Sequence, residues 1–176
     1  AGLQELALPF YSSANKSFGV KQGQFHNPPA TSFLRLNDPS KYGDDLSGFR
    51  QTVLDVNNNK NYVSGIEKGV SGFAIRGLAP IAFEGRHIGS IEFGMSLDEA
   101  FLNIIKDKYG IDVTVHAYDG SSFKLLATTN SALAVLDNAQ LRQAMSQTVT
   151  TITKSKGDNF ALYAGKLTDY NNNTIG

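Results

Sequence analysis

The chain has 176 residues, of which 41% are hydrophobic, with 16 basic and 16 acidic side chains. Such a chain can bury a core of its own, as one domain or as two small ones. The zero net charge argues against a basic patch that binds nucleic acid or a membrane surface. The lack of cysteine excludes disulfides and thiol catalysis. The sequence has no run of about 18 apolar residues, the length needed to span a bilayer.

The first 60 residues predict two helices with one strand between them. Apolar residues recur at helical spacing over residues 3–18, interrupted by Pro9, and predict the end of a longer helix that enters from upstream. Residues 21–29 are expected to form a loop, because two consecutive prolines hold its end extended. A strand is predicted at residues 31–36 and a helix at about residues 45–57, which has an acidic start.

A hairpin in the middle of the chain is the strongest local signal. Two apolar runs, Gly72 to Phe83 and His87 to Met95, flank the pair Glu84-Gly85. An acidic residue followed by glycine typically closes a two-residue β-turn. The hairpin should therefore be the centre of an antiparallel sheet, with its turn exposed.

The register of this hairpin decides where its charges point. Regular pairing from the turn places Ile81 opposite Ile88 and Gly77 opposite Glu92. Both faces are then largely apolar and should be covered by protein. In this register Arg76 and Glu92 lie on opposite faces, and each needs a partner or a ligand, because a buried unpaired charge costs several kcal/mol, as an order of magnitude.

The second half predicts a helix followed by two strand pairs. Ser96 with Glu99 three residues later forms a capping-box pattern, which opens a helix that Gly110 ends. Strands are then predicted at residues 111–117 and 123–128, followed by a short helix at residues 138–146 and by two further strands at residues 149–154 and 159–166.

Two copies of one strand pattern are visible in the chain. Phe73 precedes Ile88 by fifteen residues, and Phe160 precedes Ile175 by the same interval. A similar strand lies upstream of each, at Val63 and at Val149. The repeat favours two lobes. Because Gly89 of the first copy is followed by a further strand, we expect the second copy to be cut just before or within its last strand.

These residues resemble a known family. The run QFHNPPATSFLRLNDPSKYGDDLSGFRQTV, followed by GIEKGVSGFAIRGLAPIAFEGRHIGSIEFG, is similar to the extracytoplasmic Cache sensor region of bacterial transmembrane receptors. The resemblance is closest to the double-Cache type of methyl-accepting chemotaxis proteins and some sensor histidine kinases. It covers residues 24–96 directly, and beyond them it depends on strand order and the repeat.

The resemblance implies an α+β, PAS-like fold in which helices flank antiparallel sheets. It also implies a periplasmic or extracellular location, membrane spans outside this chain, and a homodimer formed through the N-terminal helix of the full-length receptor. The expected divisions are the end of a signalling helix (1–21), a membrane-distal lobe (22–96), a connecting helix (97–110) and a second lobe with a truncated last strand (111–176).

Three arginines are the first candidates for a ligand site. In a PAS-like fold the pocket lies between the sheet and the adjacent helix, where Arg35, Arg50 and Arg76 would converge on a carboxylate or another oxyanion. Arg76 is the preferred anchor and Arg35 the second. The alternative is that each arginine pairs with an internal acid, among Glu67, Glu92, Asp44 and Asp45.

The remaining candidates are one histidine and two aromatic residues. His26 could donate to a ligand, bind a metal or cap a strand, and Tyr42 and Phe93 could wall a small pocket. The three histidines lie far apart in sequence, so no metal site is predicted. Since no catalytic or phosphate-binding motif is present, we expect neither an enzyme nor a bound cofactor.

The sequence therefore favours a ligand-binding sensor domain of a chemoreceptor, with its site in the first lobe and a small carboxylate or similar anion as ligand. A histidine-kinase input domain is the alternative within sensors. A structural or dimerisation module filled by its own side chains is the alternative from another class. Neither a nucleic acid nor direct membrane contact is expected.

Overall fold

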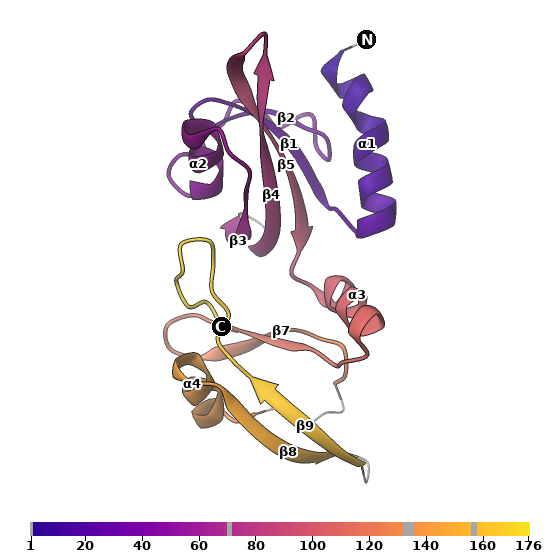
Figure 1. Cartoon of the computed structure of the whole chain (residues 1–176), viewed down its shortest axis with the longest axis vertical. Coiled ribbons are helices and arrows are strands. Elements are labelled where there is room, and N and C mark those ends of the chain that lie inside the picture. Colours follow the sequence, from indigo (N-terminus) through magenta and orange to yellow (C-terminus); the bar gives the residue numbers. More distant parts are fainter. Residues whose placement is uncertain (1, 70–71, 132–135, 156–157) are drawn as a thin grey trace. The chain divides into compact units, whose positions relative to one another are not determined.

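The computed structural model describes residues 2–69, 72–131, 136–155 and 158–176. The chain forms two compact units, Ala1–Ser96 (unit 1) and Leu97–Gly176 (unit 2). Both combine helices with antiparallel strands, so the predicted α+β class is confirmed (Figure 1). Among the described residues, no helix has both the length and the apolar composition needed to cross a membrane.

Unit 1 is built on a five-stranded antiparallel sheet of order β2-β1-β5-β4-β3, with β5 at its centre. One helix packs on each face (Figure 1). The elements are α1 (Leu3–Phe18), β1 (Gln22–Asn27), β2 (Thr31–Arg35), α2 (Gln51–Asn59), β3 (Val63–Gly69), β4 (Gly72–Phe83) and β5 (Arg86–Ser96).

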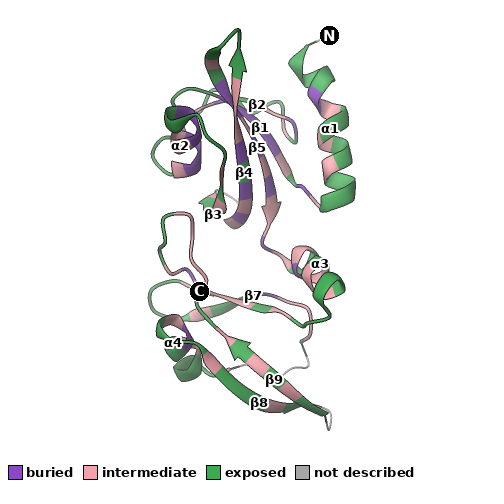
Figure 2. Ribbon diagram, viewed as in Figure 1, coloured by how far each residue is buried: buried purple, intermediate pink, exposed green. Residues whose placement is uncertain are grey.

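Each face of this sheet has its own apolar core. Figure 2 shows buried residues along the strands of unit 1 and in both of its helices. On one face, Leu78 of β4 packs with Val53 and Val56 of α2. On the other, Phe25 of β1 packs with Ala7 of α1. Because both helices bury a stripe against the sheet, unit 1 is covered on both faces, as the apolar hairpin predicted.

The segment expected to be a loop is in fact strand β1, which pairs with β2 on one side and with β5 on the other. Its sequence, QGQFHN, contains a single large apolar residue and therefore looks unlike a strand. Gln24 and His26 are nevertheless buried. Their face of the strand lies against a polar cluster rather than an apolar core.

Helix α2 begins at Gln51, six residues later than Asp45, the predicted start. The Asp45 carboxylate accepts a hydrogen bond from the Ser47 backbone N–H at 2.9 Å, which holds a turn. Aspartate stabilises such turns as readily as helix starts. Consequently Arg50 becomes the residue that precedes the helix.

The hairpin of β4 and β5 has the predicted exposed turn, but its register differs by one residue. Ala82 pairs with His87 whereas Ile81 pairs with Gly89, so that Ile88 forms a β-bulge. Beyond the bulge, Leu78 pairs with Glu92. Side chains alternate along strands, so the bulge brings Arg76 and Glu92 to the same face, and the predicted opposite placement is wrong.

Unit 2 contains two helices and two separate antiparallel strand pairs, β6-β7 and β8-β9. Its first helix is capped by Asp98, whose carboxylate accepts from the Phe101 N–H at 3.0 Å, and not by Ser96 as predicted. The elements are α3 (Glu99–Tyr109), β6 (Thr114–Tyr118), β7 (Phe123–Thr128), α4 (Asn138–Ser146), β8 (Val149–Ser155) and β9 (Asp158–Ala164).

One backbone contact recurs in the two units. A Cβ atom added at Gly89 would collide with the His26 carbonyl oxygen, and one added at Gly176 would collide with the His116 carbonyl oxygen. The hairpins of the two copies match less closely. Counted from the closing pairs of β3-β4 and β8-β9, Phe160 occupies the position of Ala74 and not that of Phe73.

Candidate functional site

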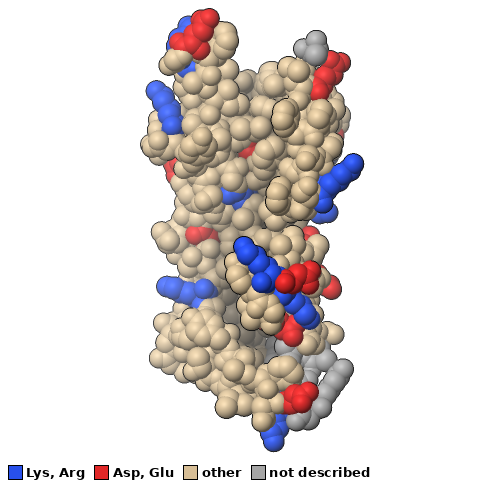
Figure 3. All heavy atoms as spheres, turned by 45° about the vertical axis from the view of Figure 1, so that its right-hand side comes forward, with Lys and Arg blue, Asp and Glu red and all other residues tan. Residues whose placement is uncertain are grey.

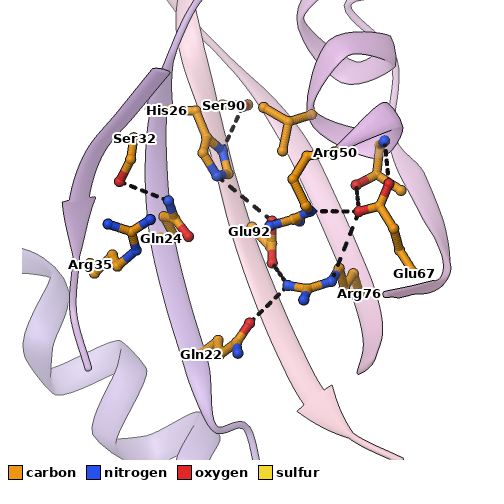
Figure 4. Close-up of polar contacts among 12 residues, drawn as sticks. Gln22, Gln24, His26, Ser32, Arg35, Arg50, Glu67, Arg76, Ser90 and Glu92 are labelled. Carbon is orange, nitrogen blue, oxygen red and sulfur yellow. Dashed lines mark hydrogen bonds and ion pairs between the residues drawn. The ribbon is translucent and has the colours of Figure 1, made fainter. Parts of the chain in front are cut away.

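A polar cluster covers the sheet face of unit 1 that α2 packs against (Figure 4). Every second residue of a strand points to the same face, and the observed register places polar residues of four strands together. Arg50 enters from the residue before α2. The strand residues are Gln22, Gln24 and His26 of β1, Ser90 and Glu92 of β5, Arg76 of β4 and Glu67 of β3.

Four charged residues, Arg50, Glu67, Arg76 and Glu92, form the centre, which we call the buried charge cluster. The Arg50 Nε donates to Glu67 Oε2 at 2.6 Å, and its Nη2 donates to Glu92 Oε2 at 2.5 Å. The Arg76 Nη1 donates to Glu92 Oε1 and also to Gln22 Oε1, the latter at 2.8 Å. None of the four is more than 6% exposed. Two cations balance two anions.

The pairing keeps Glu92 and Arg50 ionised despite their burial. Burial acts to raise the pKa of Glu92, but the Arg50 and Arg76 guanidiniums together outweigh it, and the net pKa lies below the usual value. Burial likewise acts to lower the pKa of Arg50, and the Glu92 and Glu67 carboxylates reverse the effect. Arg50 and Glu92 therefore form a true ion pair at the centre of the cluster.

Glu67 also fixes the start of α2 to the sheet. Its Oε1 accepts from the Thr52 backbone N–H at 3.0 Å, and its Oε2 accepts from the Thr52 hydroxyl at 2.7 Å. The first N–H groups of a helix have no partner within the helix, and a carboxylate satisfies them and complements the helix dipole. A change in the cluster would therefore act directly on α2.

Two buried nitrogens of the wider polar cluster make no hydrogen bond among the described residues. They are His26 Nε2 and Arg76 Nε. They lie 3.7 Å from Glu92 Oε2 and 3.9 Å from Glu67 Oε2, respectively. Burial lowers the pKa of His26 to about 4, so its ring is neutral near pH 7, and Nδ1 lies 3.1 Å from Ser90 Oγ. Leaving a buried polar group without a partner costs roughly 1–3 kcal/mol.

The structure thus brings three of the predicted site residues together, Arg50, Arg76 and His26. It also pairs Arg50 and Arg76 with internal acids, the alternative considered for them. The partner that a buried Arg76 requires is supplied by Glu92. Whether any of the three contacts a ligand remains a prediction.

The other three predicted site residues lie outside the charge cluster. Arg35 donates to both carboxylate oxygens of Asp44, at 2.8 and 2.7 Å, and to the Lys41 carbonyl at 2.7 Å. Tyr42 is 71% exposed. Phe93 pairs with Gly77 and therefore points to the α1 face, because the bulge reverses its predicted side.

Sequence reasoning found His26 and Glu92 but missed the other polar residues of β1 and β5 in the cluster, which are Gln22, Gln24 and Ser90. Gln24 donates to Ser32 Oγ at 2.9 Å, and Ser90 contacts His26. A signal for them was present, because Gln22, Gln24 and His26 alternate with period two. An alternating polar pattern is also a strand pattern, with its polar face turned inward in this case.

Unit 2 contains a cavity of about 530 Å³. Its lining is mainly apolar and includes Met145 of α4, Phe160 and Leu162 of β9, and His116 of β6. Burial lowers the pKa of His116. Within the described ranges, no group of three or more histidine or acidic side chains is placed to hold a metal ion, in this unit or in unit 1.

Comparison with models of known protein families gives a match that covers nearly the whole chain. The model of the dCache_3 family, described as the double sensory domain of two-component sensor kinases, matches residues 2–176. The chain belongs to this family. The Cache-type resemblance inferred from the sequence is therefore confirmed, and the family is a sensory one and not a catalytic one.

Solved structures share the fold of this dCache_3 chain at low identity. An extracellular ligand-binding receptor from Desulfohalobium retbaense is 18% identical, with a TM-score of 0.52 over 87% of this chain. The ligand-binding domain of the Campylobacter jejuni chemoreceptor Tlp3, in complex with 4-methylisoleucine, is 11% identical, with a TM-score of 0.50 over 90% of this chain. The chain spans 31% and 66% of these two structures. No curated protein matches it.

Proposed function

We propose that this chain is the extracytoplasmic sensory region of a bacterial transmembrane receptor, and that unit 1 binds a small carboxylate or similar anion on the α2 face of its sheet. The observation that carries the proposal is the pair of buried nitrogens, His26 Nε2 and Arg76 Nε, that lack hydrogen-bond partners among the described residues. A ligand oxygen would accept from Arg76 Nε, and also from His26 Nε2 in the tautomer that carries its proton there, in which Nδ1 accepts from the Ser90 hydroxyl. Buried donors in folded proteins are almost always paired.

Arg76 is the proposed anchor, supported by Arg50 and His26. A guanidinium with a free N–H edge binds a carboxylate oxygen through a charge-assisted hydrogen bond, which contributes about 1.5–3 kcal/mol. The Nη1 of Arg76 is held by Glu92 and Gln22, which fixes the orientation of the guanidinium. The Nε edge is the part that remains for a ligand.

Titration calorimetry of the chain with small carboxylates, amino acids and amines tests this proposal. For whichever acid binds, Arg76→Ala should weaken binding by roughly ten- to a hundredfold, at about 1.4 kcal/mol per tenfold. Arg142→Ala is the matched control, because Arg142 lies in unit 2, where it donates to the Tyr118 hydroxyl, and this variant should keep the affinity of the wild type. Equal affinities of the wild type and a folded Arg76→Ala variant would contradict the proposal.

The signal would arise from a change in the balance between two arrangements of unit 1. A ligand shifts such a balance only by its difference in affinity for the two states. Because Arg50 and Glu67 join the start of α2 to strands β3 and β5, and Glu92 of β5 also binds Arg76, an anion at Arg76 would act on α2 directly.

The sequence resemblance favours a chemoreceptor as the class of full-length receptor to which this sensory region belongs. The description of the family favours a second candidate, a sensor histidine kinase. The two differ in the full-length receptor: a kinase phosphorylates its own histidine in isolated membranes, whereas a chemoreceptor changes the activity of a separate kinase. A phosphotransfer assay with purified membranes decides between them.

A ligand-free structural module is the competing proposal. It is supported by the internal neutrality of the buried charge cluster, in which each carboxylate already contacts both guanidiniums. A panel in which no compound binds, while the folded chain still dimerises, would favour that module over a sensor.

A homodimer through the N-terminal helix is a further part of the proposal. Helix α1 exposes large apolar side chains, of which Phe10 is 74% exposed. An apolar stripe along an otherwise polar helix suits a helix–helix contact. The other exposed members are Leu3, Leu6 and Phe18.

A further inference from the structure

The Glu92 carboxylate is surrounded in the way that a bound carboxylate ligand is surrounded. Its two oxygens are taken by two different guanidiniums, Oε2 by Arg50 at 2.5 Å and Oε1 by Arg76. The His26 ring nitrogen lies 3.7 Å from Oε2. These three groups come from three separate elements, the start of α2, strand β4 and strand β1, and they converge on one point (Figure 4).

We propose that Arg50 and Arg76 form a carboxylate-binding site that the side chain of Glu92 itself occupies, so that Glu92 acts as a built-in competitor of an external anion. This inference rests on the proposed anion site of unit 1 and adds how that site is occupied and regulated. An incoming carboxylate reaches Arg76 at its Nε edge and then takes the place of Glu92 at Arg76 Nη1 and at Arg50, which breaks the hydrogen bond that joins β5 to Arg50.

The second carboxylate of the cluster explains why the site would survive the loss of Glu92. Glu67 has partners of its own, the Thr52 N–H and hydroxyl and the Arg50 Nε. It therefore continues to hold Arg50 and the start of α2 when Glu92 is absent. Two guanidiniums then face one remaining carboxylate, which leaves one excess positive charge in a buried site.

The size of the vacated space identifies the probe. Substitution of glutamate by alanine removes one CH₂ group and the carboxylate, and together these have the heavy atoms of acetate. Glu92 is fully buried, with no exposed surface, so the space is enclosed by protein. This guanidinium pair should prefer carboxylate over chloride, because each guanidinium binds one of the two carboxylate oxygens and chloride offers a single atom.

The experiment measures thermal or urea unfolding of the whole chain with the substitution Glu92→Ala. The unfolding series is recorded in sodium acetate and in sodium chloride at equal ionic strength, up to about 200 mM, because higher concentrations add general salt effects. Acetate should stabilise the variant saturably. At ten times its dissociation constant, acetate should increase the folded-to-unfolded ratio about elevenfold. The preference for acetate over chloride should be much smaller in the wild type, because Glu92 competes with acetate for the two guanidiniums.

The double variant Glu92→Ala/Arg76→Met is the matched control, since it lacks half of the site and should lose the preference for acetate. Equal responses of Glu92→Ala to acetate and chloride would overturn the inference. So would failure of Glu92→Ala to refold in acetate, because acetate supplies the missing charge.

The outcome is separable from that of the proposed function. Rescue by acetate without any binding to the wild type would support the occupied site and contradict the sensor. Binding of a carboxylate to the wild type through Arg76, without rescue of Glu92→Ala, would support the sensor and contradict the role of Glu92.

Discussion

Arg50 and Glu92 lie 42 residues apart in the sequence, and their side chains form a 2.5 Å hydrogen bond inside unit 1. The bond joins the start of α2 to the central strand β5. Breaking a buried ion pair by removing one partner leaves an uncompensated charge in a medium of low polarity. Both the stability of unit 1 and the position of α2 therefore depend on this pair.

Replacing Arg50 by methionine should destabilise unit 1 strongly. The substitution leaves Glu67 and Glu92 with a single guanidinium between them, and losses of about 3–5 kcal/mol follow when one partner of a buried pair is removed. Urea unfolding measures the effect. Arg35→Met is the control: the Asp44 side chain is 49% exposed, and such pairs contribute about 0–1 kcal/mol. Similar losses in the two variants would contradict the burial argument.

The sequence predicted the elements that have a clear apolar period, and it failed where polar side chains are buried. The hairpin of β4 and β5 and the short helix α4 were found because their patterns are local. Strand β1 was missed because Gln24 and His26 are buried among polar groups that come from other elements. A contact over tens of residues leaves no local signal.

The charge cluster could be anticipated only in part. Its arginines and acids were identified as candidates, but their assembly depends on the bulge at Ile88, which a regular hairpin register does not include. One additional residue reverses which side chains share a face. The predicted placement of Phe93 beside Arg76 failed for the same reason.

Acid should destabilise unit 1 before its carboxylates are protonated. Burial lowers the pKa of His26 from 6.5 to about 4, with Glu92 opposing the shift and Arg50, Arg35 and Arg76 adding to it. Below pH 6.5 the unfolded chain binds a proton at this site that the folded chain does not. The free energy of unfolding should therefore fall by up to about 3 kcal/mol as the pH falls from 6.5 to 4.

Unfolding curves of the wild type and His26→Gln across this range measure the contribution of His26. The variant should lose most of the slope between pH 6.5 and 4. It should retain the steeper loss below that range, where Glu92 and Asp44, whose pKa values lie below the usual range, take up protons. Parallel curves for the two proteins would rule out His26 as the source.

Gly89→Ala should destabilise unit 1 because a Cβ atom there meets the His26 backbone carbonyl. Backbone atoms cannot move aside as a side chain does, and overpacking typically costs about 1–3 kcal/mol. Gly77→Ala is the matched control, since nothing lies within 4 Å of a Cβ atom at that position of the neighbouring strand. Hydrogen exchange in β1 and β5 reports the change, and equal protection in both variants would argue against the close approach.

Phe10→Glu should prevent dimer formation if α1 is the contact. Phe10 is 74% exposed in the described structure of a single chain, and a charge in the centre of an apolar contact is strongly unfavourable. Sedimentation velocity over a range of concentrations gives the oligomeric state. Phe83→Glu, at a residue that is 60% exposed at the tip of the β4-β5 hairpin, is the control. A dimer that survives Phe10→Glu and not Phe83→Glu would place the contact elsewhere.

Charged groups at the protein surface are of both signs and are interspersed on the face shown in Figure 3. Surface charges of this kind contribute little individually, and evolution can exchange them one at a time. The buried charge cluster differs, because it is neutral only as a whole: losing Arg50, Glu67, Arg76 or Glu92 alone leaves a charge that nothing else compensates. Divergence at these four positions is therefore expected to be concerted, with a cation and an anion replaced together, and an intermediate with only one replaced would be removed by selection.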